Sequence, residues 1–248
     1  MHTCMAVIER DSFELSERLK NEPIYQWVYR ILRANIMTLR LRPGQAVSET
    51  EIASRLGISR TPVREAFIRL GEDGLLDVRP QRHSTITRID LEQAEETRFV
   101  RRSLEKSIMK EACQASFFPG LNELEENLII QESCLSGKDF GRLLMIDNDF
   151  HLAIYRRCGK QRIWAFIKKL DKSHDRLRTM TLPLIAETIV GEHREIMNLL
   201  AARRSELVDD LIDRHLTNTV ISKVILEYPA EYFTQDPRGY AQKTASTG

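Results

Sequence analysis

The residues best suited to metal chemistry lie in the second half of the chain and are Asp147, His151, His193 and His215. Asp147 and His151 are four positions apart in D-N-D-F-H-L, so on a helix both side chains project from one face. Together the four residues would offer one carboxylate and three imidazoles, a donor set that suits Zn, Ni, Mn or Fe. Spacing alone does not show that distant helices converge. The alternative for each histidine is that it is an ordinary hydrogen-bonded side chain on a half-buried helix.

Two arginines in the first third of the chain have the spacing of a DNA-reading helix. Arg60 and Arg64 are four residues apart, so they share one helix face and can each bind a guanine edge or a phosphate. Ser59 and Thr61 begin the same helix, where hydroxyls and free N–H groups can meet the DNA backbone. Solvated charges on an exposed helix are the alternative for both arginines. The opposite face carries the apolar residues Val63, Ala66, Phe67 and Leu70.

The segments around these arginines predict a winged helix-turn-helix. Apolar residues at three- and four-residue steps predict a helix from Ile24 to Leu39. S-E-T-E at 48–51 is a capping box for a short helix that stops at Gly57. The arginine-bearing helix follows, with Pro62 in its first turn, and residues 75–78 and 85–87 flank a basic hairpin tip. The second of two helices joined by a tight turn fits the major groove of DNA.

Beyond Ile89 the sequence predicts helices only. Asp90 begins a long helix, and amphipathic segments continue to about Tyr228, with a loop signal at Leu182-Pro183. The predicted fold class is therefore mainly α, an N-terminal winged helix-turn-helix followed by an all-helical bundle. The expected parts are a flexible arm over 1–20, a DNA-binding domain over 21–89, a helical domain over 90–228 and a loose tail over 229–248.

The composition is that of a globular protein without a membrane anchor or export signal. The 248 residues carry a formal net charge of +1, and 42% of them are hydrophobic. No apolar run approaches the roughly 20 residues that a membrane-spanning helix needs, and the N-terminal residues lack the apolar core of a signal peptide. We therefore expect a cytoplasmic protein that does not bind membranes. Because the total charge gives no general signal for nucleic acid, the DNA interpretation depends on the local arginines.

The stretch over 41–76 reads L-R-P-G-Q-A-V-S-E-T-E-I-A-S-R-L-G-I-S-R-T-P-V-R-E-A-F-I-R-L-G-E-D-G-L-L. It resembles the winged-helix module of GntR-type transcription regulators, and S-R-T-P-V-R-E-A is its most specific part. The resemblance covers about Ile24 to Ile89. It implies that Arg60, Thr61 and Arg64 contact DNA, with Thr50 and Ser59 assisting.

At the wing tip the sequence departs from that family. The family usually has Gly after a basic residue, whereas this chain has Arg82-His83, and a side chain with a Cβ alters the tight turn there. We assign Arg82 to the DNA-binding residues. His83 is an exposed loop histidine or, alternatively, a phosphate contact.

Residues from about Leu91 to Leu226 carry three more motifs, R-x-x-L-E at 101–105, D-x-x-F-H at 147–151 and E-H-x-x-I at 192–196. With His215 they resemble the helical FCD effector domain of the FadR branch of GntR regulators. The resemblance implies that Asp147, His151, His193 and His215 bind a divalent metal (Zn, Ni or Mn) beside an organic-acid effector. His174 has no counterpart among the ligands, and we expect it at the surface or at the rim of the effector cavity.

Arg101 is the residue that we expect to bind the effector. Its guanidinium can grip a carboxylate through two parallel N–H groups. A structural salt bridge to a nearby Glu is the alternative role for Arg101, and Arg102 is a rival for the same contact.

The sequence thus predicts a homodimeric regulator, more often a repressor than an activator in this family, that binds a pseudo-palindromic double-stranded DNA operator. A small carboxylate effector would control it, and the helical domain would bind that effector and form the dimer. The rival interpretation is a metalloenzyme in which an open metal activates water. No independent general base stands in a recognisable motif, so we expect no enzyme. A purely structural metal with an empty cavity is the third interpretation.

Overall fold

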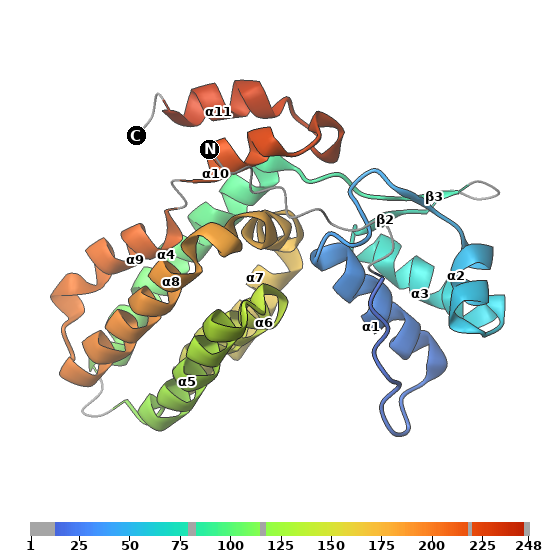
Figure 1. Cartoon of the computed structure of the whole chain (residues 1–248). Helices are drawn as coiled ribbons and strands as arrows, with labels where there is room; N and C mark the ends of the chain where they lie inside the picture. Colours follow the sequence, from blue (N-terminus) through green and yellow to red (C-terminus); the bar gives the residue numbers. More distant parts are fainter. Residues whose placement is uncertain (1–12, 79–82, 115–117, 218–219, 246–248) are drawn as a thin grey trace. The chain divides into compact units, whose positions relative to one another are not determined.

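The computed structural model describes residues 13–78, 83–114, 118–217 and 220–245, and most of them are helical (Figure 1). The chain divides into two compact units. One contains the residues up to Leu91 together with those from Ile225 onward, and the other runs from Glu92 to Val224. The predicted fold class, a winged helix-turn-helix followed by an all-helical bundle, is confirmed.

The front unit combines a helix-turn-helix with a small sheet. Its first elements are α1 (Ile24–Met37), β1 (Ala46–Val47), α2 (Glu49–Leu56), α3 (Arg60–Glu72), β2 (Leu76–Asp77) and β3 (Ser84–Ile86). The strands pair antiparallel in the order β1-β3-β2, with Ala46 opposite Thr85 and Leu76 opposite Ile86. We did not expect β1, because two residues are too few to show the alternation of a strand.

The helix signals of this unit act as their chemistry predicts. Ser48 Oγ accepts the Glu51 N–H at 3.1 Å, and Gly57 ends α2 with a φ of 66°, a conformation that glycine adopts at low cost. The apolar face of α3 packs on α1 and the sheet. Its members Val63, Ala66, Phe67 and Leu70 are each at most 1% exposed. This packing leaves the other face of α3 to solvent.

The prediction of a flexible arm is wrong for residues 13–20. The Glu14 N–H donates to Asn35 Oδ1 at 2.8 Å, and Trp27 Nε1 donates to the Ser16 carbonyl at 2.8 Å. Asn35 is fully buried on α1. A buried polar side chain thus holds the arm by its backbone, and no periodicity reveals such a contact. Residues 1–12 lie outside the described residues.

The prediction of a loose tail over 229–248 is also wrong for residues 229–245, and residues 246–248 lie outside the described residues. The C-terminal segment contains η2 (Ile225–Glu227), η3 (Ala230–Tyr232) and α11 (Pro237–Ala245). The Ile89 N–H donates to the Tyr232 carbonyl at 2.8 Å, and the Thr234 N–H donates to the Ile89 carbonyl at 3.0 Å. Phe233 is only 2% exposed. Buried aromatic side chains and these backbone hydrogen bonds therefore order the segment.

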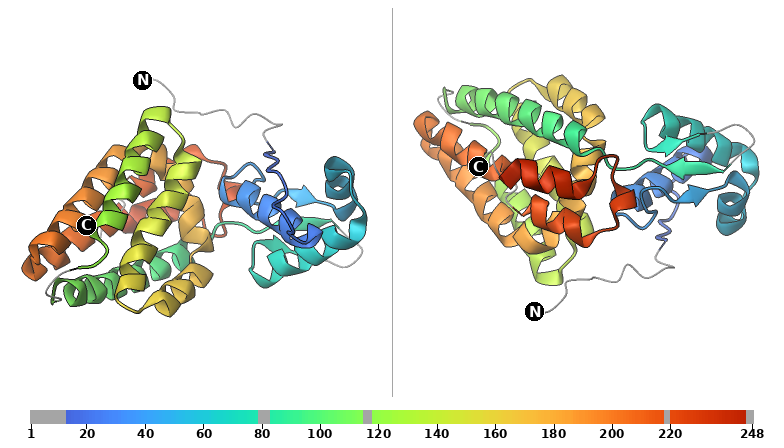
Figure 2. Two further views of the ribbon diagram at one scale, coloured as in Figure 1. Left: turned by 90° about the horizontal axis from the view of Figure 1, so that it is seen from below. Right: turned by 90° about the horizontal axis from the view of Figure 1, so that it is seen from above.

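The rear unit is a bundle of long helices. Its elements are α4 (Leu91–Gln114), α5 (Leu121–Gly137), α6 (Phe140–Arg157), α7 (Gln161–Leu170), α8 (Lys172–Ala202), η1 (Ser205–Leu207), α9 (Val208–Leu216) and α10 (Ile221–Val224). Helices α5, α6 and α8 pack on one another, and α9 packs on α8 (Figures 1 and 2). The core between them contains Leu128, Phe150, Ile154, Ile196 and Ile212, each at most 1% exposed.

The loop that we predicted at Leu182-Pro183 does not exist, because α8 continues through Pro183. A proline inside a helix costs about 3 kcal/mol. Leu182, Ala186 and Val190 are buried on one face of α8, and their packing offsets this cost. No helix in the described ranges is long and apolar enough to cross a membrane.

Candidate functional site

Four side chains meet inside the rear unit. Asp147 and His151 extend from α6, His193 from α8 and His215 from α9, and their exposed fractions are 1%, 0%, 0% and 7%. One ring nitrogen from each histidine lies within 4.8 Å of the others. His151 Nε2 is 3.3 Å from His215 Nε2, and Asp147 Oδ1 is 3.6 Å from His193 Nε2. The structure therefore brings together the residues that the sequence nominates as metal ligands.

An outer layer of oxygen atoms orients the imidazole rings. Each Nδ1 atom faces an oxygen atom, an arrangement that suits a proton on Nδ1 and a lone pair of Nε2 toward the centre. The three pairs are His151 with Glu105 Oε2 at 3.0 Å, His193 with Gln131 Oε1 at 2.8 Å and His215 with Glu192 Oε2 at 2.9 Å. Ligand histidines typically have partners of this kind.

The inward-facing atoms fit a divalent cation. Among the described residues, neither His193 Nε2 nor Asp147 Oδ1 has a hydrogen-bond partner, although both are buried. With both protons on Nδ1, the Nε2 lone pairs of His151 and His215 would face each other at 3.3 Å, and a positive charge between them would relieve their repulsion. Buried polar atoms without partners cost free energy, and a cation at this point would satisfy them together.

The charge states also suit a metal. Burial lowers the pKa of His151 and lowers that of His193 well below its usual value, so both rings are neutral near neutral pH. Burial alone would raise the pKa of Asp147. The Arg178 guanidinium, which forms an ion pair with Oδ2, acts together with the nearby His193, His151 and Arg101 to outweigh burial and lower that pKa, so the carboxyl is ionised. Metal ligands must be deprotonated in this way.

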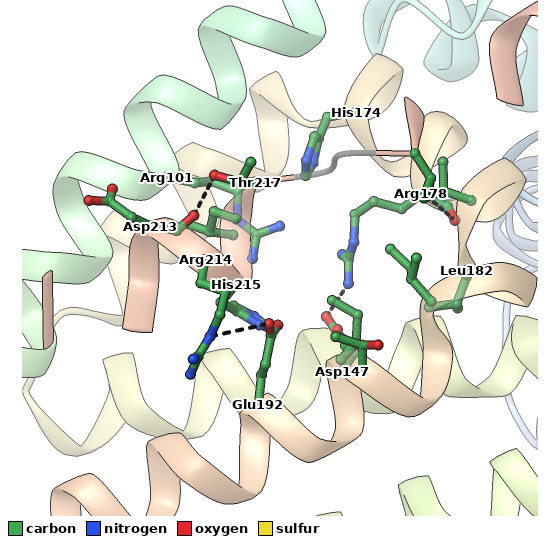
Figure 3. Close-up of a pocket in the computed structure, with 16 residues that line it drawn as sticks. Arg101, Asp147, His174, Arg178, Leu182, Glu192, Asp213, Arg214, His215 and Thr217 are labelled. Atoms are coloured by element: carbon green, nitrogen blue, oxygen red, sulfur yellow. Dashed lines mark hydrogen bonds and ion pairs between the residues drawn. The ribbon is translucent and has the colours of Figure 1, made fainter. Parts of the chain in front are cut away.

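A cavity of about 580 Å³ opens next to this cluster (Figure 3). Asp147 and His215 reach its wall, together with Arg101, His174 and Arg178. Figure 3 shows Arg178 directed toward Asp147, the contact that the ion pair makes. One wall of the cavity is thus part of the candidate metal centre.

Arg101 lines this cavity and also makes the salt bridge that was its alternative role. It is 1% exposed, and its Nη2 lies 3.0 Å from Glu105 Oε1. The other Glu105 oxygen faces His151, so Glu105 joins Arg101 to the histidine cluster. Arg102 is not among the residues that line the cavity. Its side chain is 40% exposed and lies 3.8 Å from Asp213.

His174 lies at the wall of the cavity, as the sequence allowed. Its Nδ1 is 2.8 Å from Asp171 Oδ1, and with Asp175 the two form a second group of metal-binding atom types. Cationic side chains already neutralise these carboxylates. Lys168 Nζ lies 2.6 Å from Asp171, and Arg178 Nη1 lies 3.2 Å from Asp175. We therefore do not count this group as a metal centre.

The face of α3 opposite the core presents the residues that we expect to bind DNA. Ser59, Arg60, Thr61 and Arg64 are exposed there, and Thr50 is exposed on α2. Arg60 Nη2 lies 3.3 Å from Glu49 Oε2, a loose exposed pair that a phosphate can displace. Arg82 lies outside the described residues, and His83 is exposed.

Three residues of the site were missed in the sequence. Glu192 precedes His193 directly, and that adjacency was the available signal. Gln131 and Arg178 had no local signal, because Gln131 lies on a helix without a motif and Arg178, although on α8, lies outside the E-H-x-x-I motif. Only the packing of α5 and α8 against α6 brings them to the cluster.

Comparisons with known proteins agree with this architecture. Residues 24–86 match the family described as bacterial regulatory proteins, gntR family, and residues 96–218 match the FCD domain. The HTH-type transcriptional repressor RspR of Escherichia coli (strain K12) is 30% identical to 87% of this chain, and the match covers 96% of RspR. The uncharacterized HTH-type transcriptional regulator YdhC of Bacillus subtilis (strain 168) is 26% identical, over 84% of this chain and 93% of YdhC.

Solved structures show the same fold. Escherichia coli McbR/YncC superposes with a TM-score of 0.68 at 22% identity, covering 84% of this chain and all (100%) of that one. A putative GntR transcriptional regulator from Rhodococcus sp. RHA1 gives 0.65 at 24% identity, with 83% and 99% covered. From the two family matches and the RspR relationship, the chain belongs to the GntR family of bacterial regulatory proteins with an FCD domain, and it is a DNA-binding transcriptional regulator rather than an enzyme.

Proposed function

We propose that this regulator is a homodimeric repressor whose affinity for its operator is set by a small carboxylate bound beside a divalent metal. The observation that carries the proposal is the cluster of inward-facing donor atoms, two of them without partners, at the wall of a 580 Å³ cavity. RspR, a relative over nearly its whole length, is named a repressor, which supports that direction of control.

The metal would be held by Asp147 and by the Nε2 atoms of His151, His193 and His215. Zn, Ni and Mn all accept such donors. When bound, the metal would supply a Lewis-acidic centre that attracts a carboxylate from the cavity. Glu105, Gln131 and Glu192 would keep the three rings oriented, because each faces an Nδ1 atom.

Arginine side chains would complete the effector site. Arg178 lies at the cavity wall with a side chain 14% exposed, so a bound anion can reach its guanidinium. Arg101 is more deeply buried and forms an ion pair with Glu105, so it would contribute mainly positive potential to the cavity that it lines. Both guanidinium groups stay charged in the cavity. The site therefore favours a carboxylate over a neutral ligand of the same shape.

Helix α3 would bind the operator. Arg60 and Arg64 would enter the major groove, while Ser59, Thr61 and Thr50 would contact phosphates. Two copies of the chain would place two such helices about one DNA turn apart on a pseudo-palindrome. Effector binding would change operator affinity by a coupling of about 1–3 kcal/mol, which is roughly 5–150-fold.

The test begins with the operator. Full-length metal-loaded protein is mixed with sheared genomic DNA at near-physiological salt, where weak phosphate-only binding is lost, and the retained fragments are sequenced. Fluorescence anisotropy on the enriched palindrome is then measured with a panel of organic acids. We expect Arg64→Ala to lose the operator, and His193→Gln to keep the operator but lose the response to acid.

Two results would contradict the proposal in different ways. If no acid changes the affinity for the operator, the proposed effector control is wrong. If chelation of the metal then lowers the melting temperature, the metal has a purely structural role. If no fragment is enriched with or without metal, the assigned DNA face of α3 is wrong.

A further inference from the structure

Two chemically different sets of side chains line the cavity beside the candidate metal centre. The charged set includes Arg178, which points toward Asp147 (Figure 3). The apolar set consists of three aliphatic side chains of α8, spaced at three- and four-residue steps, and two more from Leu216 and Val220. We call these five residues the apolar wall; they are Leu182, Ile185, Ile189, Leu216 and Val220.

We propose that the apolar wall makes this site selective for carboxylates that carry an apolar body, such as an alkyl or aryl acid, over polyhydroxylated acids. The inference rests on the proposed effector site and specifies which acids that site takes. The carboxylate would lie against Arg178 and the candidate metal ligands, and the hydrocarbon would lie against the apolar wall.

The first argument is the placement of the wall. Ile185 and Ile189 are half-buried on α8 and face the cavity. Leu182 projects into the cavity beside Arg178 (Figure 3). Apolar surface that borders a cavity gains free energy when hydrocarbon replaces water against it. A ligand with an apolar body would provide that hydrocarbon.

The second argument is that several polar side chains lining the cavity already have partners. The Thr181 hydroxyl donates to the Arg178 carbonyl at 3.3 Å, and the Thr217 hydroxyl donates to the Asp213 carbonyl at 2.5 Å. Two anionic side chains that line the cavity are also engaged. Glu192 contacts His215 at 2.9 Å, and Asp213 contacts Lys106 at 2.7 Å. The hydroxyls of a sugar acid that lie against the apolar wall or against these engaged groups would lose water without gaining a full replacement, which costs affinity.

The third argument is size. A volume of 580 Å³ lies within the range of about 300–1,000 Å³ that is typical of sites for drug-sized ligands. A carboxylate group alone would leave most of this volume filled with water. The effector that we propose would therefore have a body, and the apolar wall would favour an apolar one.

The experiment measures binding by calorimetry to the full-length, metal-loaded protein. The probes are the straight-chain acids from acetate to octanoate, with gluconate as the hydroxylated counterpart of hexanoate. Each methylene buried against the wall should tighten binding about fourfold until the cavity is filled. Gluconate should bind at least about tenfold more weakly than hexanoate.

Matched variants assign the effect to the wall. Ile185→Thr and Ile189→Thr should flatten the dependence on chain length while acetate binding stays the same. Leu184→Thr is the control, because Leu184 neighbours Ile185 on α8 but is 53% exposed and does not line the cavity. Thermal melts of all variants establish that each is folded.

The possible failures separate the inference from the proposed function. Gluconate binding as tightly as hexanoate, or affinity independent of chain length, would overturn the selectivity and leave the carboxylate site intact. A length dependence that Leu184→Thr removes as fully as Ile185→Thr would place the apolar contact outside the cavity and also overturn it. If no acid of either kind binds the metal-loaded protein, the proposed effector site itself is wrong.

Discussion

Replacing Gln131 with methionine should weaken metal binding although it removes no ligand. Gln131 is fully buried, and its Oε1 lies 2.8 Å from His193 Nδ1. The amide orientation is determined, because its Nε2 donates to Asn127 Oδ1 at 2.7 Å while Asn127 Nδ2 donates to the Ile146 carbonyl at 3.0 Å. Methionine has a similar length and lacks the acceptor, so the His193 N–H would be left without one.

The size of the effect follows from this one hydrogen bond. A buried donor left unsatisfied costs about 1–3 kcal/mol. Loss of a partner behind a metal ligand typically weakens metal binding about 10–100-fold, which is about 1.4–2.7 kcal/mol. Part of the cost falls on the metal-free protein and lowers its stability. The rest falls on the metal complex, where the imidazole N–H is a stronger donor and the ring must point at the ion.

Competition with a chromophoric chelator measures the metal affinity, and thermal melts of the chelated and loaded protein measure the stabilisation. At equal free metal, the stabilisation of Gln131→Met should be smaller than that of the wild type by about 1.4–2.7 kcal/mol. Gln161→Met, at the exposed start of α7, is the control and should change neither quantity. A Gln131→Met protein that is less stable but binds metal within twofold of the wild type would refute the reasoning.

Three further outcomes are expected. Arg178→Leu leaves the buried Asp147 without its cation, so the metal-free protein should lose about 3–5 kcal/mol and the loaded protein less; equal losses in the two melts would contradict this. Phe233→Ala should destabilise the front unit by about 3–5 kcal/mol in urea unfolding, and a loss under 1 kcal/mol would mean that the C-terminal segment is not anchored there. Because burial lowers the pKa of His193, the unfolded chain binds a proton at a pH where the folded chain does not. The stability of the metal-free protein should therefore be full above about pH 6.5 and fall as the pH drops below it. Thermal melts at pH 7.5 and 5.5 would measure this fall, and His193→Gln should reduce it.

Local chemistry explains what could be predicted from the sequence. The start and end of α2 follow from Ser48 and Gly57, whose effects act within a few residues. The pairing of Asp147 with His151 follows from the period of a helix. The exposed face of α3 follows from the apolar residues opposite it. Each of these inferences needs only one element and its immediate neighbours in the chain.

What the sequence could not predict depends on contacts between distant elements. Gln131 lies 62 positions from His193, and nothing around it on α5 indicates the contact. Pro183 looked like a break because the packing of Leu182 and Ala186, which outweighs it, is not local. The C-terminal segment looked loose because its small and polar residues dominate the composition. Phe233, one of its few aromatic residues, is nevertheless buried.

Arg178 has the largest consequence of the residues that the sequence did not nominate. Its guanidinium pairs with Asp147, a candidate metal ligand, and also reaches the cavity where we place the effector. A metal at the cluster would neutralise the charge of Asp147 and weaken its ion pair with Arg178, and an anion bound to Arg178 would in turn weaken the competition of Arg178 for Asp147. Metal and effector would therefore bind cooperatively through one side chain. Since linkage is reciprocal, the acid should tighten metal binding by the same factor by which the metal tightens binding of the acid.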